Sequence, residues 1–417
     1  MTVSTATTVL ELSKRYLIPT YSRFDLEIQR GAGCRVWTES GHEFLDFGAG
    51  IAVCSLGHAH PEVTKAIAHQ SAQLVHTSNL YYTRPAAELA RQLVENIDAE
   101  GKVFFCNSGA EANEGLIKLA RKFGAVSGGR YEIITFQGSF HGRTLAGISA
   151  TGQEKVKKGF GPLVPGFVHV PYGDLEAVKS ALGEKTIAIL LEPIQGEGGI
   201  HIANAEFLQG LRKLCDEQGL LLLFDEVQCG LGRTGDWCGW KSIAGTSVLP
   251  DGVAWAKGIA NGFPLGACWI SSRNFMHLGP LCDLLGPGSH GTTYGGNPVS
   301  CAAALAVLEV IKRESLLMNA LEVGAYFREE LRTIQSPFIA KIRALGLMIG
   351  VEFDPSIASI LPSSPEGQLA GRLATALIAK GLLAIPAGER VLRFLPPLNV
   401  TRFEVDEAVE KLRAVLK

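Results

Sequence analysis

The strongest constraint on the fold is an alternation of short apolar runs with longer amphipathic segments, which begins at about residue 85. Strand-length apolar runs lie at 103–106, 187–191, 220–224 and 253–256. Segments with helical spacing lie at 111–123 and 206–218, and a long helix that opens with proline is predicted at 297–313. Strands that alternate with helices favour a parallel, doubly wound sheet with helices on both faces. We therefore predict an α/β fold with a large, mainly parallel sheet.

The pattern changes near residue 315, where a second α+β unit begins. Its predicted strands and helices lie at 341–345, 348–353 and 391–395, and at 368–380 and from residue 404 onward. The first 70 residues contain a predicted hairpin, for which Ser40-Gly41 provides the turn. We predict a large domain at 71–315 and a smaller α+β domain made from both chain ends, 1–70 and 316–417.

Composition excludes several classes of protein. Apolar residues make up 47% and charged residues 19% of the 417 residues, which is the opposite of a disordered chain. A net charge of −2 provides no basic surface for nucleic acid, and no apolar run reaches the length of a membrane span. The first residues lack a signal-peptide pattern. Nine cysteines without a C-x-x-C pair predict reduced thiols and a cytoplasmic protein.

The first polar cluster at a predicted strand end is Asn107-Ser108-Gly109-Ala110-Glu111. In open α/β sheets, ligands bind beyond the carboxyl ends of the strands. The cluster opens a predicted helix, and its small residues leave backbone N–H groups free to bind an anion such as phosphate. An ordinary helix N-cap at Ser108 is the alternative interpretation.

Two further clusters follow later strands. Asp225 ends a run of five apolar residues, and a buried carboxylate there needs a partner, which could be a salt bridge or a cationic ring nitrogen. Lys257 is the only charged residue between Asp251 and Arg273, so burial should lower the pKa of its amine and make it a nucleophile. The alternative is a lysine with a buried stem and a solvated ammonium group.

Taken together, the three clusters match the needs of pyridoxal phosphate. An anion-binding cradle would hold its phosphate, a carboxylate would keep its ring nitrogen protonated, and a lysine would form the Schiff base. A dinucleotide-binding site is less well supported. The glycine-rich segments GAGCRV and GAGIAV both lack the last glycine of the G-x-G-x-x-G fingerprint. The motifs H-E-x-x-H, G-x-S-x-G and the phosphate-binding P-loop are all absent. The pair His58-Ala59-His60 alone does not predict a metal site.

The residues in these clusters and around them resemble the class III, fold-type-I pyridoxal-phosphate aminotransferases. The similar segments, which run in order over nearly the whole chain, are GIAVCSLGHAHPEV, HTSNLYY, CNSGAEANEGLIKLAR, FHGRTLAGISATGQ, EPIQGEGG, LLLFDEVQCGLGRTG, PDGVAWAKGIANGFPLGA, HGTTYGGNP and VLRFLPPL. Each segment is short, but their order and spacing together are specific.

The resemblance implies contacts with the cofactor. Lys257 would form the Schiff base and move protons, and Asp225 would pair with the pyridine nitrogen. The other implied cofactor contacts are Ser108, Gly109, Ala110, Phe140, Glu226, Val227, Gln228 and, from a partner subunit, Thr293. The contact from the partner implies a homodimer with shared active sites.

The resemblance also implies how substrates bind. Arg143 would hold the substrate α-carboxylate as a bidentate fork, and Thr292 would lie beside the amino donor. Arg393 would bind the α-carboxylate of 2-oxoglutarate or glutamate, while Glu197 would neutralise Arg393 when the other substrate is bound. Such a switch allows one pocket to accept two unlike substrates.

The implied activity is transfer of the terminal amino group of N2-acetylornithine to 2-oxoglutarate, a step of arginine biosynthesis. The alternatives within the family are succinylornithine, ornithine and 4-aminobutyrate as amino donors, and N-succinyl-diaminopimelate is a further substrate left open. A class III aminomutase would be a different class of enzyme, and the predicted pair of Glu197 and Arg393 argues against it. A regulator with a DNA-binding module is disfavoured because the family pattern begins within about 25 residues of Met1.

Overall fold

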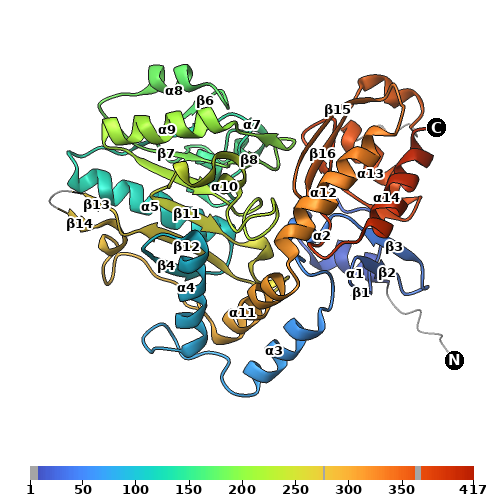
Figure 1. Cartoon of the computed structure of the whole chain (residues 1–417), viewed down its shortest axis with the longest axis horizontal. Helices are drawn as coiled ribbons and strands as arrows, with labels where there is room; N and C mark the ends of the chain where they lie inside the picture. Colours follow the sequence, from blue (N-terminus) through green and yellow to red (C-terminus); the bar gives the residue numbers. More distant parts are fainter. Residues whose placement is uncertain (1–7, 276–277, 362–367) are drawn as a thin grey trace.

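The computed structural model describes residues 8–275, 278–361 and 368–417. Its larger part is built on a seven-stranded sheet with the strand order β4-β12-β11-β10-β7-β5-β6, seen on the left of Figure 1. The strands are β4 (Gly101–Cys106), β5 (Glu132–Phe136), β6 (Phe167–Val170), β7 (Thr186–Leu191), β10 (Leu221–Asp225), β11 (Gly252–Trp255) and β12 (Gly266–Ser271). Strand β12 runs in the opposite direction to the other six strands. The predicted α/β fold with a mainly parallel sheet is confirmed.

Helices cover both faces of this sheet. The helices of this part are α3 (Pro61–Ser71), α4 (Arg84–Ile97), α5 (Gly109–Val126), α6 (Leu145–Ala150), α7 (Glu154–Lys157), α8 (Leu175–Ala181), α9 (Ala205–Gln218), α10 (Gly239–Ala244) and α11 (Pro298–Arg313), with short 3-10 turns η1 (Gly245–Ser247), η2 (Lys257–Ala260) and η4 (Leu281–Asp283). Two short hairpins complete it, β8 (Ile194–Gln195) with β9 (His201–Ile202) and β13 (Asn274–Phe275) with β14 (Gly279–Pro280).

Strand β10 shows why the sheet is buried on both faces. Leu221 and Leu223 belong to the apolar cluster that includes helix α5, whereas Leu222 and Phe224 belong to the cluster that includes α9. Side chains alternate between the faces of a strand, so an uninterrupted apolar run serves both clusters. The same alternation places the next residue, Asp225, on the α5 face.

The smaller part, on the right of Figure 1, contains both chain ends. Its elements are α1 (Val9–Tyr16), β1 (Arg30–Ala32), β2 (Arg35–Trp37), β3 (Glu43–Asp46), α2 (Ala49–Ala52), α12 (Leu316–Arg332), β15 (Ile339–Leu345), β16 (Met348–Phe353), η5 (Pro355–Ser359), α13 (Leu369–Ile378), β17 (Leu382–Leu383), β18 (Ile385–Ala387), β19 (Val391–Phe394) and α14 (Arg402–Val415). Its two sheets have the orders β1-β2-β3-β17 and β15-β16-β19-β18.

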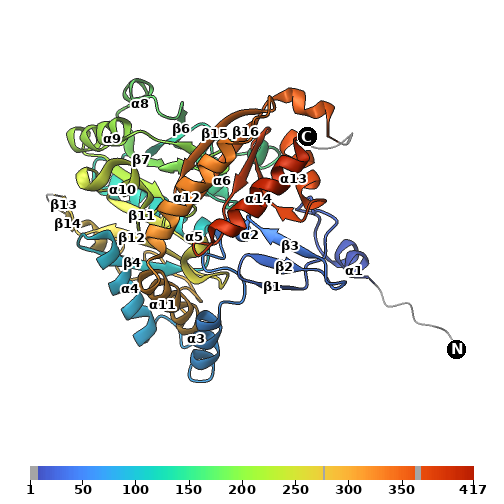
Figure 2. The same ribbon diagram turned by 45° about the vertical axis from the view of Figure 1, so that its right-hand side comes forward.

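The chain ends meet in one sheet, because β17 pairs in parallel with β3. Figure 2 shows β1, β2 and β3 beneath α13 and α14. The predicted hairpin is present, with Gly41 in the left-handed region at φ 85° between β2 and β3. The proposed boundaries at 70/71 and 315/316 stay predictions.

Strands β5, β6 and β12 were not predicted from the sequence. Strand β12 lies within the same weakly charged stretch as Lys257, which was interpreted as one segment around the lysine. Among the described residues, no helix has the length and apolar character needed to cross a membrane.

Candidate active site

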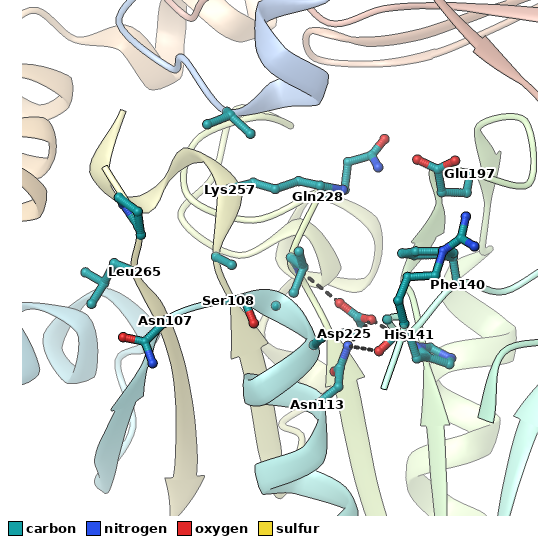
Figure 3. A pocket seen from close by; sticks show the side chains of 18 of the residues that line it. Asn107, Ser108, Asn113, Phe140, His141, Glu197, Asp225, Gln228, Lys257 and Leu265 are labelled. Carbon is teal, nitrogen blue, oxygen red and sulfur yellow. Dashed lines mark hydrogen bonds and ion pairs between the residues drawn. The ribbon is translucent and has the colours of Figure 1, made fainter. Parts of the chain in front are cut away.

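Three neighbouring strands end at the same edge of the large sheet. Leu191 of β7 lies opposite Phe224 of β10, and Asp225 lies opposite Ala254 of β11. The residues at the carboxyl ends of these strands therefore lie close together at one edge of the sheet, where ligands bind in parallel sheets. They line a cavity of about 370 Å³, which is shown in Figure 3.

One side of the cavity is the N-terminus of helix α5. Ser108 is the N-cap, and its hydroxyl accepts a hydrogen bond from the Glu111 N–H at 3.2 Å. The N–H groups of Gly109 and Ala110 have no hydrogen-bond acceptor among the described residues. Free N–H groups at the positive end of an 18-residue helix form a binding site for an anion.

Close packing explains why residue 109 is glycine. A Cβ atom at Gly109 would lie 2.8 Å from one methyl group of Val227 and 3.0 Å from the other. A side chain here would displace Val227 and fill the space beside the helix terminus. The cradle therefore depends on glycine as well as on the helix dipole.

Asp225 is a buried residue of the cavity lining and is held by three hydrogen bonds. Its Oδ2 accepts from the amide nitrogen of Asn113 at 2.7 Å and from His141 Nδ1 at 2.8 Å, and its Oδ1 accepts from the Val227 N–H at 3.1 Å. Figure 3 shows Asn113 and His141 beside Asp225. We call these three residues, Asp225, Asn113 and His141, the floor of the cavity.

Lys257 follows β11 and opens the 3-10 turn η2 with φ 43°, an uncommon conformation for a residue with a side chain. Its side chain extends into the cavity toward Gln228 (Figure 3). Burial lowers the pKa of its amine, Glu197 opposes this effect, and Arg393 adds to it. More of the amine is neutral, and so nucleophilic, than in a solvated lysine.

Glu192 follows β7 at the same level as Asp225. Its two carboxylate oxygens accept hydrogen bonds from the N–H groups of Phe140 at 2.9 Å and Gly196 at 3.1 Å. Burial, together with the nearby charge of Asp225, raises the pKa of Glu192 to about 7. Glu192 therefore ties two loops of the cavity to the end of β7.

A buried ion pair closes another side of the cavity, with Glu197 in the lining and Arg393 behind it. Arg393 of β19 is 1% exposed, and its Nη2 lies 3.0 Å from Glu197 Oε1. Its Nη1 donates to Gln228 Oε1 at 2.9 Å. Burial alone would raise the pKa of Glu197, but Arg393 and Lys257 outweigh it, so this pKa is lowered. We call Glu197, Gln228 and Arg393 the wall; it joins the two parts of the molecule.

Arg143 lies at the exposed side of the cavity. Its guanidinium carbon is 5.6 Å from the centre of the Phe140 ring, and both residues line the cavity. No ion pair is found for Arg143 among the described residues. A solvated guanidinium beside the cavity can bind a substrate carboxylate by donating hydrogen bonds to it.

Most of the predicted site residues meet in this cavity. Those that line it are Ser108, Gly109, Ala110, Phe140, Arg143, Glu197, Asp225, Val227, Gln228 and Lys257. Arg393 lies behind Glu197 and does not line it.

Glu226, predicted as a cofactor contact, lies outside the cavity lining. Its carboxylate accepts the N–H groups of Gly239 and Trp240 at the start of α10, both at 2.8 Å. Burial raises the pKa of Glu226 to about 8, against the effect of these hydrogen bonds. The alternation along the chain turns Glu226 away from its neighbour Asp225, so its position supports a structural role.

Thr292 and Thr293 also lie outside the cavity lining. Thr292 accepts a hydrogen bond from Asn107, which lines the cavity, at 3.1 Å. Thr293 is exposed and lies in a separate hollow with His76 and Asn297. The predicted role of Thr293 in a partner subunit stays a prediction.

His141, Asn113 and Glu192 were not among the predicted site residues. Asn113 is a polar residue on the buried face of α5, where its neighbours Ala112, Leu116 and Ile117 are apolar. An amide in such a position needs a buried partner, and this signal could have identified it. Glu192 has the same signal as Asp225, because it directly follows an apolar run, whereas His141 has no comparable local signal.

The cavity fits pyridoxal phosphate. The free N–H groups of α5 suit a phosphate, Asp225 suits a protonated ring nitrogen, and the Lys257 amine suits an aldehyde carbon. The described residues contain no cluster of potential ligands for a metal ion.

Comparison with known proteins agrees with this geometry. The model of the class-III aminotransferase family matches residues 17–416. The acetylornithine aminotransferase of Caldanaerobacter subterraneus subsp. tengcongensis is 46% identical over 412 residues, which cover 98% of this chain and 99% of the relative.

Two solved structures extend the comparison. The N-acetylornithine aminotransferase of Stenotrophomonas maltophilia has a TM-score of 0.79 and 35% identity, with 98% of each chain covered. An ornithine aminotransferase from Toxoplasma gondii, with pyridoxal phosphate at partial occupancy in its active site, has a TM-score of 0.88 and 31% identity over 99% of this chain and 95% of that one.

Proposed function

The chain belongs to the class-III aminotransferase family of pyridoxal-phosphate enzymes, and from this premise we propose that it transfers the terminal amino group of N2-acetyl-L-ornithine to 2-oxoglutarate. The products would be N-acetyl-L-glutamate 5-semialdehyde and L-glutamate, in a step of arginine biosynthesis. The observation that carries the proposal is the buried pair of Arg393 and Glu197 beside Lys257. A cation that can be neutralised or released suits an enzyme with two unlike substrates.

Pyridoxal phosphate, when bound, supplies an aldehyde carbon for the amino group and a protonated ring that withdraws electrons from the reacting carbon. Asp225 would hold the negative charge that keeps the ring nitrogen protonated, and Asn113 and His141 would hold Asp225 in place. Lys257, with its lowered pKa, would take the proton from the terminal carbon of the amino donor.

Substrate orientation would depend on the two arginines. Arg143, at the exposed side of the cavity, would bind the α-carboxylate of the donor as a fork. Arg393 would stay paired with Glu197 during this half-reaction and would bind a carboxylate of 2-oxoglutarate in the next. Glu197 must then turn away, and it can do so because its side chain is 30% exposed.

We also propose that the enzyme is a homodimer and works in the cytoplasm. Large apolar side chains are exposed in the segment 74–82 and in the loop that contains Thr293, namely Leu74, Val75, Leu80, Tyr81, Tyr82 and Tyr294. Exposed apolar side chains of this kind suit a subunit interface, where Thr293 could reach a partner's cofactor. All nine cysteines are free thiols, which suits a reducing compartment.

The proposal predicts a ranking of amino donors. Single half-reactions of the holoenzyme with N2-acetylornithine, N2-succinylornithine, ornithine and 4-aminobutyrate would be followed through the cofactor absorbance. We expect kcat/KM for N2-acetylornithine to exceed the values for ornithine and 4-aminobutyrate by about tenfold or more, since acyl recognition adds contacts in the pocket. The variant Lys257→Ala is the control and should show no half-reaction.

Each other outcome has a defined meaning. A first rank for 4-aminobutyrate or ornithine would exclude the arginine-pathway assignment but keep the aminotransferase. A first rank for succinylornithine would change the proposed substrate only in its acyl group. Turnover of a donor without any need for 2-oxoglutarate would point to an aminomutase instead.

A further inference from the structure

The hairpin of β8 and β9 carries Glu197 at its tip, and this tip packs against the sheet of the smaller part. We define the tip as residues 196–200, of which three are glycines. Gly196 precedes Glu197, and Gly198 and Gly199 follow it. A segment so rich in glycine has little conformational preference of its own, so its shape must come from contacts with other elements.

The sheet of the smaller part presents a row of three residues to this tip. Arg343 of β15 lies opposite Gly350 of β16, and Gly350 lies opposite Arg393 of β19. Directly opposed residues in an antiparallel sheet point to the same face. The row is therefore two arginine side chains with a gap between them at Gly350.

Ile200 of the tip fills that gap. A Cβ atom at Gly350 would lie 2.9 Å from both Cβ and Cγ1 of Ile200, so glycine is needed for this approach. Ile200 is fully buried and has φ 57°, a strained conformation for a β-branched residue. Packing against Gly350 holds the backbone of the tip in this conformation.

The two arginines of the row bind the tip in different ways. Arg393 contacts the side chain of Glu197 at 3.0 Å, whereas Arg343 Nε donates to the backbone carbonyl of Gly199 at 2.9 Å. Arg343 is itself oriented by Glu352, which accepts from its Nη1 at 2.7 Å. Only the first of these contacts has to break when a substrate carboxylate takes Arg393.

We propose that Arg343 is a positioning residue that sets the balance between the two substrates. By holding the Gly199 carbonyl, it keeps the backbone of Glu197 within reach of Arg393 while the Glu197 side chain moves in and out. Without this hydrogen bond, Glu197 neutralises Arg393 less often, and a donor that lacks a second carboxylate binds less well. This inference rests on the proposed function, because it needs Glu197 to exchange with a substrate carboxylate.

The test is Arg343→Gln, assayed as the holoenzyme in the two half-reactions separately. We expect kcat/KM for N2-acetylornithine to fall about tenfold, the usual effect of losing one hydrogen bond from a charged group. The value for 2-oxoglutarate should stay within about threefold of the parent, because Arg393 is then easier to reach. Arg343→Lys, which keeps the charge but cannot bind Gly199 and Glu352 together, should be intermediate.

Arg390→Gln is the matched control. Arg390 binds the same carboxylate, Glu352, at 3.1 Å, and makes no hydrogen bond or ion pair with the tip in the described part of the chain. Loss of Arg390 should leave the ratio of the two half-reactions unchanged. An equal change of this ratio in Arg390→Gln and Arg343→Gln would overturn the proposal, because it would show a general effect of the Glu352 ion pairs.

The variant Glu197→Gln separates failure of this inference from failure of the proposed function. If Arg343 acts through Glu197, the double variant should have the same ratio as Glu197→Gln alone. Additive effects, or an unchanged ratio in Arg343→Gln when Glu197→Gln changes it, would overturn the role of Arg343. An unchanged ratio in Glu197→Gln would instead overturn the switch on which the proposed function depends.

Discussion

The floor and the wall of the cavity are built in contrasting ways. The floor joins the end of β10, helix α5 and the segment after β5, all in the larger part. Its central carboxylate accepts hydrogen bonds from Asn113, His141 and the Val227 N–H. The wall joins the β8–β9 hairpin to β19 of the smaller part through an ion pair whose acidic side chain is 30% exposed. We infer that the chemistry common to both substrates uses the fixed groups of the floor. Discrimination between the substrates uses the exchangeable pair of Glu197 and Arg393.

The hydrogen-bond partners support this distinction. The bonds that hold Asp225 come from a ring nitrogen, an amide nitrogen and a backbone N–H, and none of these donors needs to move during the proposed reaction. Arg393 keeps Gln228 and the carbonyl of Pro386 as partners when Glu197 leaves. A buried guanidinium must keep such partners, since an unpaired buried charge is costly.

Loss of charge in the floor should have the largest effect. Asp225→Asn keeps the size of the side chain but removes the anion beside the predicted ring nitrogen. We expect kcat/KM to fall by about a hundredfold to a thousandfold in both half-reactions, since an electrostatic contribution to the transition state is lost. Single-turnover rates with N2-acetylornithine and with 2-oxoglutarate measure this.

Asn113→Ala sharpens the same test, because it removes one hydrogen bond from Asp225 and no charge. We expect kcat/KM to fall about tenfold, and by the same factor for both substrates. A strong bias toward one substrate in either variant would contradict the assignment of the floor to the common chemistry.

A change in the wall should affect one substrate. Arg393→Lys keeps the charge but loses the planar fork that reaches Gln228, Pro386 and Glu197. We expect kcat/KM for 2-oxoglutarate to fall by about a hundredfold, and the value for N2-acetylornithine by about tenfold at most. Comparable losses in both half-reactions would remove the distinction between floor and wall.

The smallest expected effect links the two regions through Lys257. The carboxylate of Glu197 stabilises the ammonium form of Lys257, against burial and Arg393. Its loss in Glu197→Gln should favour the neutral amine and lower the pKa of Lys257 further. The midpoint pH for covalent loading of the apoprotein with pyridoxal phosphate should therefore move down, and an upward movement would contradict this electrostatic link.

Much of the site could be predicted because its residues stand at the ends of apolar runs. Asp225 at the end of β10, Ser108 before α5 and Lys257 after β11 can each be identified from a window of a few residues. Strands that are short, or that lie within a weakly charged stretch as β12 does, are harder to predict. Glu226 illustrates the limit, because its neighbour Asp225 is in the cavity while its own carboxylate caps α10.

The sequence by itself determined the secondary structure around the site and the chemical types available, because both depend on local periodicity and on the nature of individual side chains. Only the tertiary structure decided that Arg343, Gly350 and Arg393 form one row and that Ile200 enters it. The register between β15, β16 and β19, and the approach of a hairpin from about 150 residues earlier in the chain, come from packing between distant segments. No local pattern in the chain encodes these contacts, which is why the buried partners of Asp225 and the contact between Arg343 and Gly199 had to be found in three dimensions.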